Sequence, residues 1–122
     1  MTIERTPILL AEDEAMLRMI AVEMLEDAGF KVFEAADGVE ALELLTANPE
    51  ILLLVSDIKM PRMDGYALVE AGLKFKPSLK VLLMTGYSNE PPPHLVKAAE
   101  IQILHKPFNL ERLCALAAEM TA

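Results

Sequence analysis

A short apolar run that ends in a carboxylate most constrains how this chain can fold. Residues 51–56 are Ile-Leu-Leu-Leu-Val-Ser, and Asp57 follows them directly. A run this short and this continuously apolar is typical of a strand buried in a parallel sheet. The turn formers Pro61, Asp64 and Gly65 come next, so Asp57 is expected at the carboxyl end of that strand. Ligands bind at this end of open α/β sheets, although an acid there can also simply end the strand or cap a helix.

Four further apolar runs predict strands around this central one. They lie at residues 7–11, 31–35, 80–84 and 101–104. The run at 31–35 alternates between apolar and polar residues, which indicates an edge strand. Helical patterns separate the strands, so the chain is expected to form a doubly wound α/β sandwich of five strands and five helices. A flavodoxin-like parallel sheet in the order 2-1-3-4-5 would place the first and third strands side by side.

Apolar residues three and four apart indicate the buried faces of the helices. Asp13 is a candidate N-cap for the first helix, and Asn109 for the last. The inward stripe of the first helix is expected to contain Leu17, Ile20, Ala21, Met24 and Ala28. Val22 is expected to lie outside this stripe. The third helix is expected to bury Leu68, Val69, Leu73 and Phe75. In place of a regular fourth helix, only a short one up to about residue 99 is expected, because Pro91, Pro92 and Pro93 favour an extended entry.

Length and composition limit the classes of protein that the chain can represent. Its 122 residues suit one domain spanning 1–122, without a separate effector domain. No apolar run approaches the ~20 residues of a membrane span. Because the N-terminus also lacks a signal-peptide pattern, a cytoplasmic location without membrane attachment is expected. The net charge of -8 argues against direct binding to nucleic acid. The single cysteine, Cys114, excludes an internal disulfide and a thiolate metal cluster.

The expected strand order would bring five functional groups together at one edge of the sheet. Glu12 and Asp13 follow the first strand, Asp57 ends the third, Thr85 follows the fourth and Lys106 follows the fifth. Three carboxylates repel one another unless a cation joins them, and oxygen ligands without His or Cys suit Mg²⁺. A hydroxyl and an ammonium group suit phosphoryl oxygens, and a carboxylate can attack a phosphoryl group. The pattern therefore predicts cation-assisted phosphoryl transfer to Asp57.

These strand ends resemble those of the receiver domain of two-component response regulators, over almost the whole chain. The matching segments are residues 9–14, 56–65, 84–88 and 105–108. The resemblance implies that Asp57 accepts a phosphoryl group from a sensor histidine kinase or a histidine phosphotransfer protein. It also implies that Mg²⁺ or Mn²⁺ is bound by Glu12, Asp13, Asp57 and the backbone carbonyl of Lys59. Such a protein catalyses its own phosphorylation and dephosphorylation but is not a turnover enzyme.

The resemblance further implies how the phosphoryl group is held and sensed. Thr85 would be the switch hydroxyl and Lys106 the phosphate-binding lysine, with a cis peptide between Lys106 and Pro107. Three features depart from the usual pattern. Glu12 replaces an Asp, which is a mild change. Ile103 replaces the aromatic residue that acts as a rotating switch, and the prolines at 91–93 fall where the fourth helix should begin. Phosphorylation is still expected to reach residues 88–99 through movement of Thr85 and Gly86, without the rotation of a ring.

Several alternatives remain open from the sequence alone. The chain could be a stand-alone regulator of the chemotaxis-regulator type, a monomer or weak dimer acting on an unknown output protein, or a receiver module from a hybrid histidine kinase. An enzyme alternative is a Mg²⁺-dependent phosphohydrolase with Asp57 as nucleophile, in which Lys59 would stand where such enzymes have a second acid. A flavin-binding protein and a docking module that is never phosphorylated are further alternatives. The acids at residues 12–14 would repel the phosphate of a flavin.

Overall fold

The computed structural model describes residues 5–86, 100–106 and 109–122. Its strands are β1 (Thr6–Ala11), β2 (Phe30–Ala35), β3 (Leu53–Asp57), β4 (Lys80–Thr85) and β5 (Ile101–His105). Its helices are α1 (Ala15–Asp27), α2 (Gly38–Ala47), α3 (Gly65–Phe75) and α5 (Leu110–Thr121). The short helix expected up to about residue 99, with its three prolines, lies outside the described residues.

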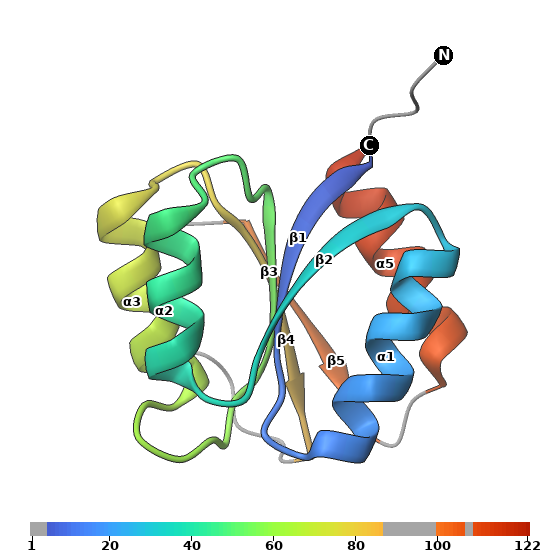
Figure 1. The fold of residues 1–122 in the computed structure, drawn as a ribbon, viewed down its shortest axis with the longest axis horizontal. Coiled ribbons are helices and arrows are strands. Elements are labelled where there is room, and N and C mark those ends of the chain that lie inside the picture. Colours follow the sequence, from blue (N-terminus) through green and yellow to red (C-terminus); the bar gives the residue numbers. More distant parts are fainter. Residues whose placement is uncertain (1–4, 87–99, 107–108) are drawn as a thin grey trace.

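The five strands form one parallel sheet in the order β2-β1-β3-β4-β5, which confirms the predicted topology. Helices α2 and α3 cover one face of the sheet, and α1 and α5 cover the other (Figure 1). The alternating strand β2 lies at an edge, as expected. Among the helices of the described ranges, none combines the length and the apolar character that crossing a bilayer requires.

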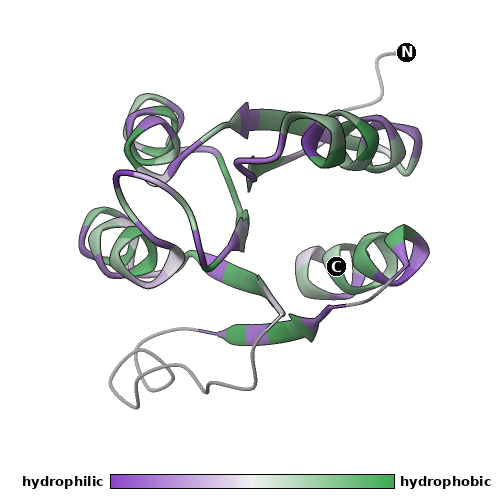
Figure 2. Cartoon of the chain, turned by 90° about the horizontal axis from the view of Figure 1, so that it is seen from below, coloured by the Kyte–Doolittle hydropathy of each residue, from purple (hydrophilic) through white to green (hydrophobic). Residues whose placement is uncertain are grey.

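Two apolar clusters, one on each face of the sheet, hold the layers together. Alternate residues of β3 serve the two clusters: Leu54 faces α2 and α3, whereas Leu53 and Val55 face α1 and α5. The strands are accordingly largely green in Figure 2, while each helix carries both colours. All five residues of β3 are buried because the strand is central and covered on both faces. This burial gives the carboxyl end of β3 a rigid base.

The central strand begins two residues later than the sequence predicted. Ile51 is buried, but its backbone N–H closes the turn after α2 by donating to the Asn48 carbonyl at 3.1 Å. Leu52 donates to the Pro7 carbonyl and leaves its side chain 43% exposed. An apolar run therefore marked the strand correctly but could not show where regular pairing starts.

Side-chain caps begin three of the four described helices. Asp37, Asp64 and Asn109 each accept a hydrogen bond from the backbone N–H three residues on, at 2.9, 2.8 and 2.7 Å. The prediction that Asp13 caps α1 is wrong. Helix α1 has Glu14 at its N-cap position and no side-chain cap there. The carboxylate of Asp13 instead joins a group of acids beside the sheet.

Helix α1 is rotated relative to the stripe that the sequence predicted. Leu17 and Ile20, expected inside, are 37% and 41% exposed. The buried residues of α1 are Ala21 and Leu25, and Val22 packs against the cluster beneath them. Arg18 falls on this inward side, three residues before Ala21, because its guanidinium group has partners there. Periodicity of apolar residues could not anticipate a charged residue on the inward face.

Phe75 is a second residue that the sequence placed inside and the structure does not. It is the last residue of α3 and is 45% exposed. Leu79, in the turn that follows, enters the cluster under α2 and α3 instead and is 1% exposed.

Tyr66 supports a prediction about stability. Its ring packs against the cluster under α2 and α3, but its buried hydroxyl oxygen has no hydrogen-bond partner among the residues that the structure describes. An unpaired buried hydroxyl costs about 1–3 kcal/mol. We therefore expect Tyr66→Phe to raise the free energy of unfolding by about 1 kcal/mol, as measured by urea denaturation. Tyr66→Leu should lower it, because the ring is lost; a loss of stability in Tyr66→Phe would contradict the assignment.

Candidate functional site

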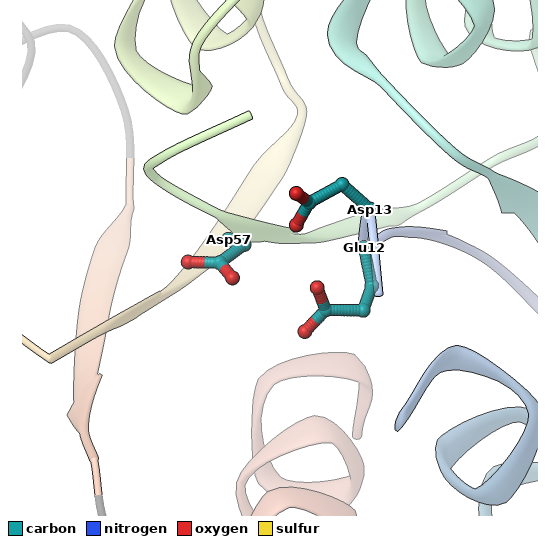
Figure 3. A group of neighbouring side chains, drawn as sticks. All are labelled: Glu12, Asp13 and Asp57. Atoms are coloured by element: carbon teal, nitrogen blue, oxygen red, sulfur yellow. The ribbon is translucent and has the colours of Figure 1, made fainter. Parts of the chain in front are cut away.

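The carboxyl ends of β1 and β3 bring three acids together. Strands β1 and β3 pair in parallel with Ala11 opposite Ser56, so Glu12 and Asp57 follow at the same level. Each of Glu12, Asp13 and Asp57 offers a carboxylate oxygen within 4.8 Å of the others. Figure 3 shows Glu12 and Asp13 directed toward the side of Asp57. Glu12 and Asp57 are only 4% and 8% exposed, whereas Asp13 is open to solvent.

The donor set fits a hard divalent cation. All three groups supply carboxylate oxygens, which suit Mg²⁺ or Mn²⁺. Buried carboxylates this close would otherwise repel one another. Glu12 in place of the commoner Asp still brings its oxygen into the group, so the substitution preserves the arrangement of acids.

Lys106 supplies the positive charge nearest to the expected acceptor. Its Nζ lies 2.9 Å from Oδ2 of Asp57 and forms an ion pair with it. Burial acts to lower the pKa of Lys106, but the hydrogen bond and the charge of Asp57 outweigh that effect and raise the pKa above its ordinary value. The ammonium group therefore stays charged at neutral pH and can offset negative charge at Asp57.

Thr85 completes the group at the end of β4. It is 2% exposed, and its backbone carbonyl accepts a hydrogen bond from the Lys106 N–H at 2.7 Å. Thr85, Lys106 and Asp57 line one open pocket of about 410 Å³, together with Ile58, Lys59 and Gly86. This backbone bond fixes the position of the Lys106 backbone relative to Thr85.

Glu12 has the most perturbed acidity in the site. The pKa of Glu12 is raised from 4.5 to about 7, mainly by burial. The hydrogen bond from the Glu14 N–H to its carboxylate, at 3.1 Å, opposes the rise, and so does the charge of Lys106. The charge of Asp57 and a hydrogen bond with Asp13 contribute to the rise. Without a cation, Glu12 is therefore partly protonated near neutral pH.

The loop after Asp57 is fixed by contacts that the sequence did not reveal. Gly65 begins α3 so close to this loop that an added Cβ would lie 2.6 Å from the Asp57 carbonyl oxygen. Arg62 has a left-handed φ of 67°, unusual for a residue other than glycine. Its guanidinium group is held by Asp37, with Nε and Nη2 at 2.9 and 2.8 Å from one carboxylate oxygen. The N-cap of α2 therefore also anchors the loop that carries Lys59.

Arg18 is a second residue near the site that sequence reasoning missed. Its Nη1 donates to the backbone carbonyl of Glu12 at 2.8 Å. Its Nε lies 3.4 Å from a carboxylate oxygen of Glu34 in β2. Nothing in the spacing of apolar residues pointed to this contact, because the predicted stripe left Arg18 on the outer side of α1.

The remaining predicted residues stand as follows. Lys59 lies at the pocket, and its role as a carbonyl ligand stays a prediction. Ile103 lies in β5 opposite Leu83 and packs, half-buried, on the face covered by α2 and α3. Its role as a switch also stays a prediction. Pro107 lies outside the described residues, and so does the expected cis peptide before it.

The acidity of Glu12 predicts a pH dependence of stability. Its proton is held more tightly in the folded chain, so this group stabilises the cation-free fold fully below about pH 4.5 and progressively less as the pH rises through 7. With a chelator present, the melting temperature of the parent chain should therefore fall between about pH 5.5 and about pH 8. Glu12→Gln should remove the share of this fall that comes from Glu12. Glu14→Gln, at an exposed neighbour, should keep the decline. Equal pH profiles for the parent chain and Glu12→Gln would contradict the prediction.

The chain matches a family model and individual proteins over most of its length. Residues 8–118 match the model of the response regulator receiver domain. The chain is 39% identical over 115 residues to the sensor kinase CckA of Brucella abortus (strain 2308), covering 93% of this chain and 12% of that kinase. It is 38% identical over 107 residues to the response regulator receiver protein CpdR of the same organism, covering 87% of this chain and 88% of CpdR. The chain thus corresponds to a small part of one relative and to most of the other.

Solved structures are similar over the same extent. The receiver domain of the hybrid histidine kinase CckA superposes with a TM-score of 0.81 at 31% identity, covering 95% of this chain and 99% of that one. The chemotaxis protein CheY4 of Vibrio cholerae superposes with a TM-score of 0.82 at 30% identity, covering 96% and 99%. Since the family model matches nearly the whole chain and the fold agrees, the chain belongs to the response regulator receiver domain family.

Proposed function

We propose that this receiver domain accepts a phosphoryl group on Asp57 from a phosphorylated histidine of a sensor kinase or a phosphotransfer protein. Receiver domains are signalling modules, and they interact with such kinases and phosphotransfer partners. The observation that carries the proposal is the position of Asp57, which is paired with Lys106 at 2.9 Å on one side and grouped with Glu12 and Asp13 on the other. Positive charge and cation-binding oxygens thus meet at one nucleophile.

The transfer itself makes one bond and breaks one bond. A carboxylate oxygen of Asp57 attacks phosphorus, and the phosphorus–nitrogen bond to the donor imidazole breaks, with its electron pair returning to the ring. The product is an acyl phosphate whose negative charge lies on the phosphoryl oxygens. Lys106, already beside Asp57, is placed to pair with these oxygens instead.

Glu12, Asp13, Asp57 and, as a further proposed ligand, the carbonyl of Lys59 would hold Mg²⁺ or Mn²⁺. When bound, the cation would offset the charge of the transferring group. The three acids would position the cation, whose charge would relieve their repulsion, and the Glu14 N–H donates to one carboxylate oxygen of Glu12. A phosphohydrolase is less well supported, because Lys59 stands where such an enzyme would have its second acid.

We further propose that output begins at Thr85. Its hydroxyl would be drawn toward a phosphoryl oxygen, and Gly86 would follow, while the bond between its carbonyl and the Lys106 N–H ties the movement to the lysine. Ile103 of β5, which lies opposite Leu83 of β4, would fill part of the space that an aromatic ring occupies in other receivers. The output would be a change in contacts with a partner protein. The similar segment is 12% of the sensor kinase CckA but 88% of CpdR, so a stand-alone module and a module of a larger protein remain alternative settings.

The acceptor can be tested by chemical labelling. Acetyl phosphate should label the chain once, and only with Mg²⁺ or a similar cation present, because the carboxylates repel the donor without it. Asp57→Asn should abolish labelling, measured by mass spectrometry of the intact protein. Asp64→Asn, which changes an exposed acid seven residues on, should be labelled like the parent chain. Undiminished labelling of Asp57→Asn would show that the acceptor lies elsewhere.

The cation site can be tested by its effect on stability. An ion that binds only the folded chain adds about 2.7 kcal/mol at 100 times its dissociation constant. Millimolar Mg²⁺ should therefore raise the melting temperature at about pH 8, where Glu12 is ionised. Asp13→Asn should reduce this rise, whereas Asp27→Asn at the far end of α1 should leave it unchanged. A parent chain that melts at the same temperature with and without Mg²⁺ would count against the site.

A further inference from the structure

We infer that Arg18 is a positioning residue that fixes the peptide bond between Glu12 and Asp13, and so sets the cation affinity of the site. The inference rests on the proposed function, because it takes these two acids to be cation ligands. Arg18 touches neither carboxylate: its Nη1 donates to the Glu12 backbone carbonyl at 2.8 Å. It would act through the backbone that carries both acids.

The bonded carbonyl belongs to the peptide unit that joins the two acids. A peptide unit is planar, so the direction of its carbonyl fixes the plane between the Cα atoms of Glu12 and Asp13. The preceding peptide unit is fixed as well, since the Glu12 N–H donates to the Ala35 carbonyl of β2 at 3.0 Å. The backbone at Glu12 is thus held from β2 on one side and from α1 on the other. With both planes fixed, the two carboxylates leave the backbone in set directions.

The contact is built into the packing of α1 and is not a chance surface bond. Arg18 lies on the inward side of the helix with Ala21 and Leu25, and its side chain is only 20% exposed. This placement turns the apolar residues Leu17 and Ile20 toward solvent. A charged side chain therefore takes a position on the inward face of α1 where the guanidinium group reaches the backbone of the acidic loop.

Neither the charge of Arg18 nor its ion pair with Glu34 accounts for its place beside the acids. An electrostatic role would require Arg18 to pair with the acids, but its Nη1 is bonded to a backbone carbonyl, and Lys106 is the cation that pairs with Asp57. A surface ion pair with Glu34 would contribute little, because the Glu34 side chain is 52% exposed. The hydrogen bond to the Glu12 carbonyl is the contact that a positioning role requires, whereas an electrostatic role or a role as the partner of Glu34 does not require it.

The test is the Mg²⁺ dissociation constant, measured by following amide resonances during a titration with Mg²⁺ alone. Arg18→Met keeps much of the aliphatic stem and removes every donor. Groups that orient metal ligands typically change metal affinity by about 10–100-fold when removed, so we expect binding about tenfold weaker. Glu34→Gln, which leaves the bond to the Glu12 carbonyl in place, should bind Mg²⁺ within about twofold of the parent chain.

Arg5 offers a matched control at the other end of the same helix. Its Nη1 donates to the Glu26 carbonyl of α1 at 3.0 Å, the same kind of bond far from the acids. Arg5→Met is expected to change, at most, the melting temperature measured without Mg²⁺. It should leave the dissociation constant for Mg²⁺ unchanged. Arg18→Lys, with one donor that can reach a carbonyl, should recover part of the lost affinity. A purely structural role would change the melting temperatures and leave the Mg²⁺ affinity alone.

The outcomes separate this inference from the proposed function. If the parent chain does not bind Mg²⁺, the cation site itself is refuted. If the parent binds and Arg18→Met binds equally well, only the role of Arg18 is refuted. Equal weakening by Glu34→Gln would also overturn it, because the ion pair and not the carbonyl bond would then matter. Should Arg18→Met fail to fold, Arg18→Gln decides in the same way, since its amide nitrogen ends two bonds short of the Nη1 atom that donates to the Glu12 carbonyl.

Discussion

Repulsion among three carboxylates is the constraint that the rest of this structure serves. Glu12, Asp13 and Asp57 have oxygens within 4.8 Å of one another, and two of the three side chains are almost fully buried. Such a group persists only because the chain around it is rigid and because Lys106 balances part of its charge. The covered central strand β3 supplies the rigidity, and its parallel pairing with β1 decides which acids meet. The same repulsion makes the group selective for a partner that brings positive charge.

Much of the fold followed from elements whose chemistry is local. Continuous apolar runs marked the central strands, alternation marked the edge strand β2, and Asn109 marked the start of α5. Once the strand order was inferred, the carboxyl ends of the strands placed Asp57, Thr85 and Lys106 in one pocket. These predictions succeeded because each depends on a short stretch of sequence and on one general rule of parallel sheets.

The predictions that failed concern polar contacts between distant segments. Asp13 was expected to cap α1, but its carboxylate lies with acids from β3. Leu17 was expected inside, but Arg18 takes the inward side of the helix to reach the chain after β1. Likewise, no local pattern shows that Asp37 both caps α2 and holds Arg62 in a left-handed conformation. Apolar periodicity locates a helix but does not specify its rotation when one strong hydrogen bond competes with several weak apolar contacts.

The order of the site residues along the chain has a consequence for how the protein is made. Glu12 and Asp13 follow β1, Asp57 ends β3 and the lysine follows β5, with Lys106 49 residues beyond Asp57. A chain that extends only through β4 contains four of the five strands and all three acids of the site. It still lacks the ammonium partner of Asp57. The site is therefore complete only once β5 has been made and has paired with β4.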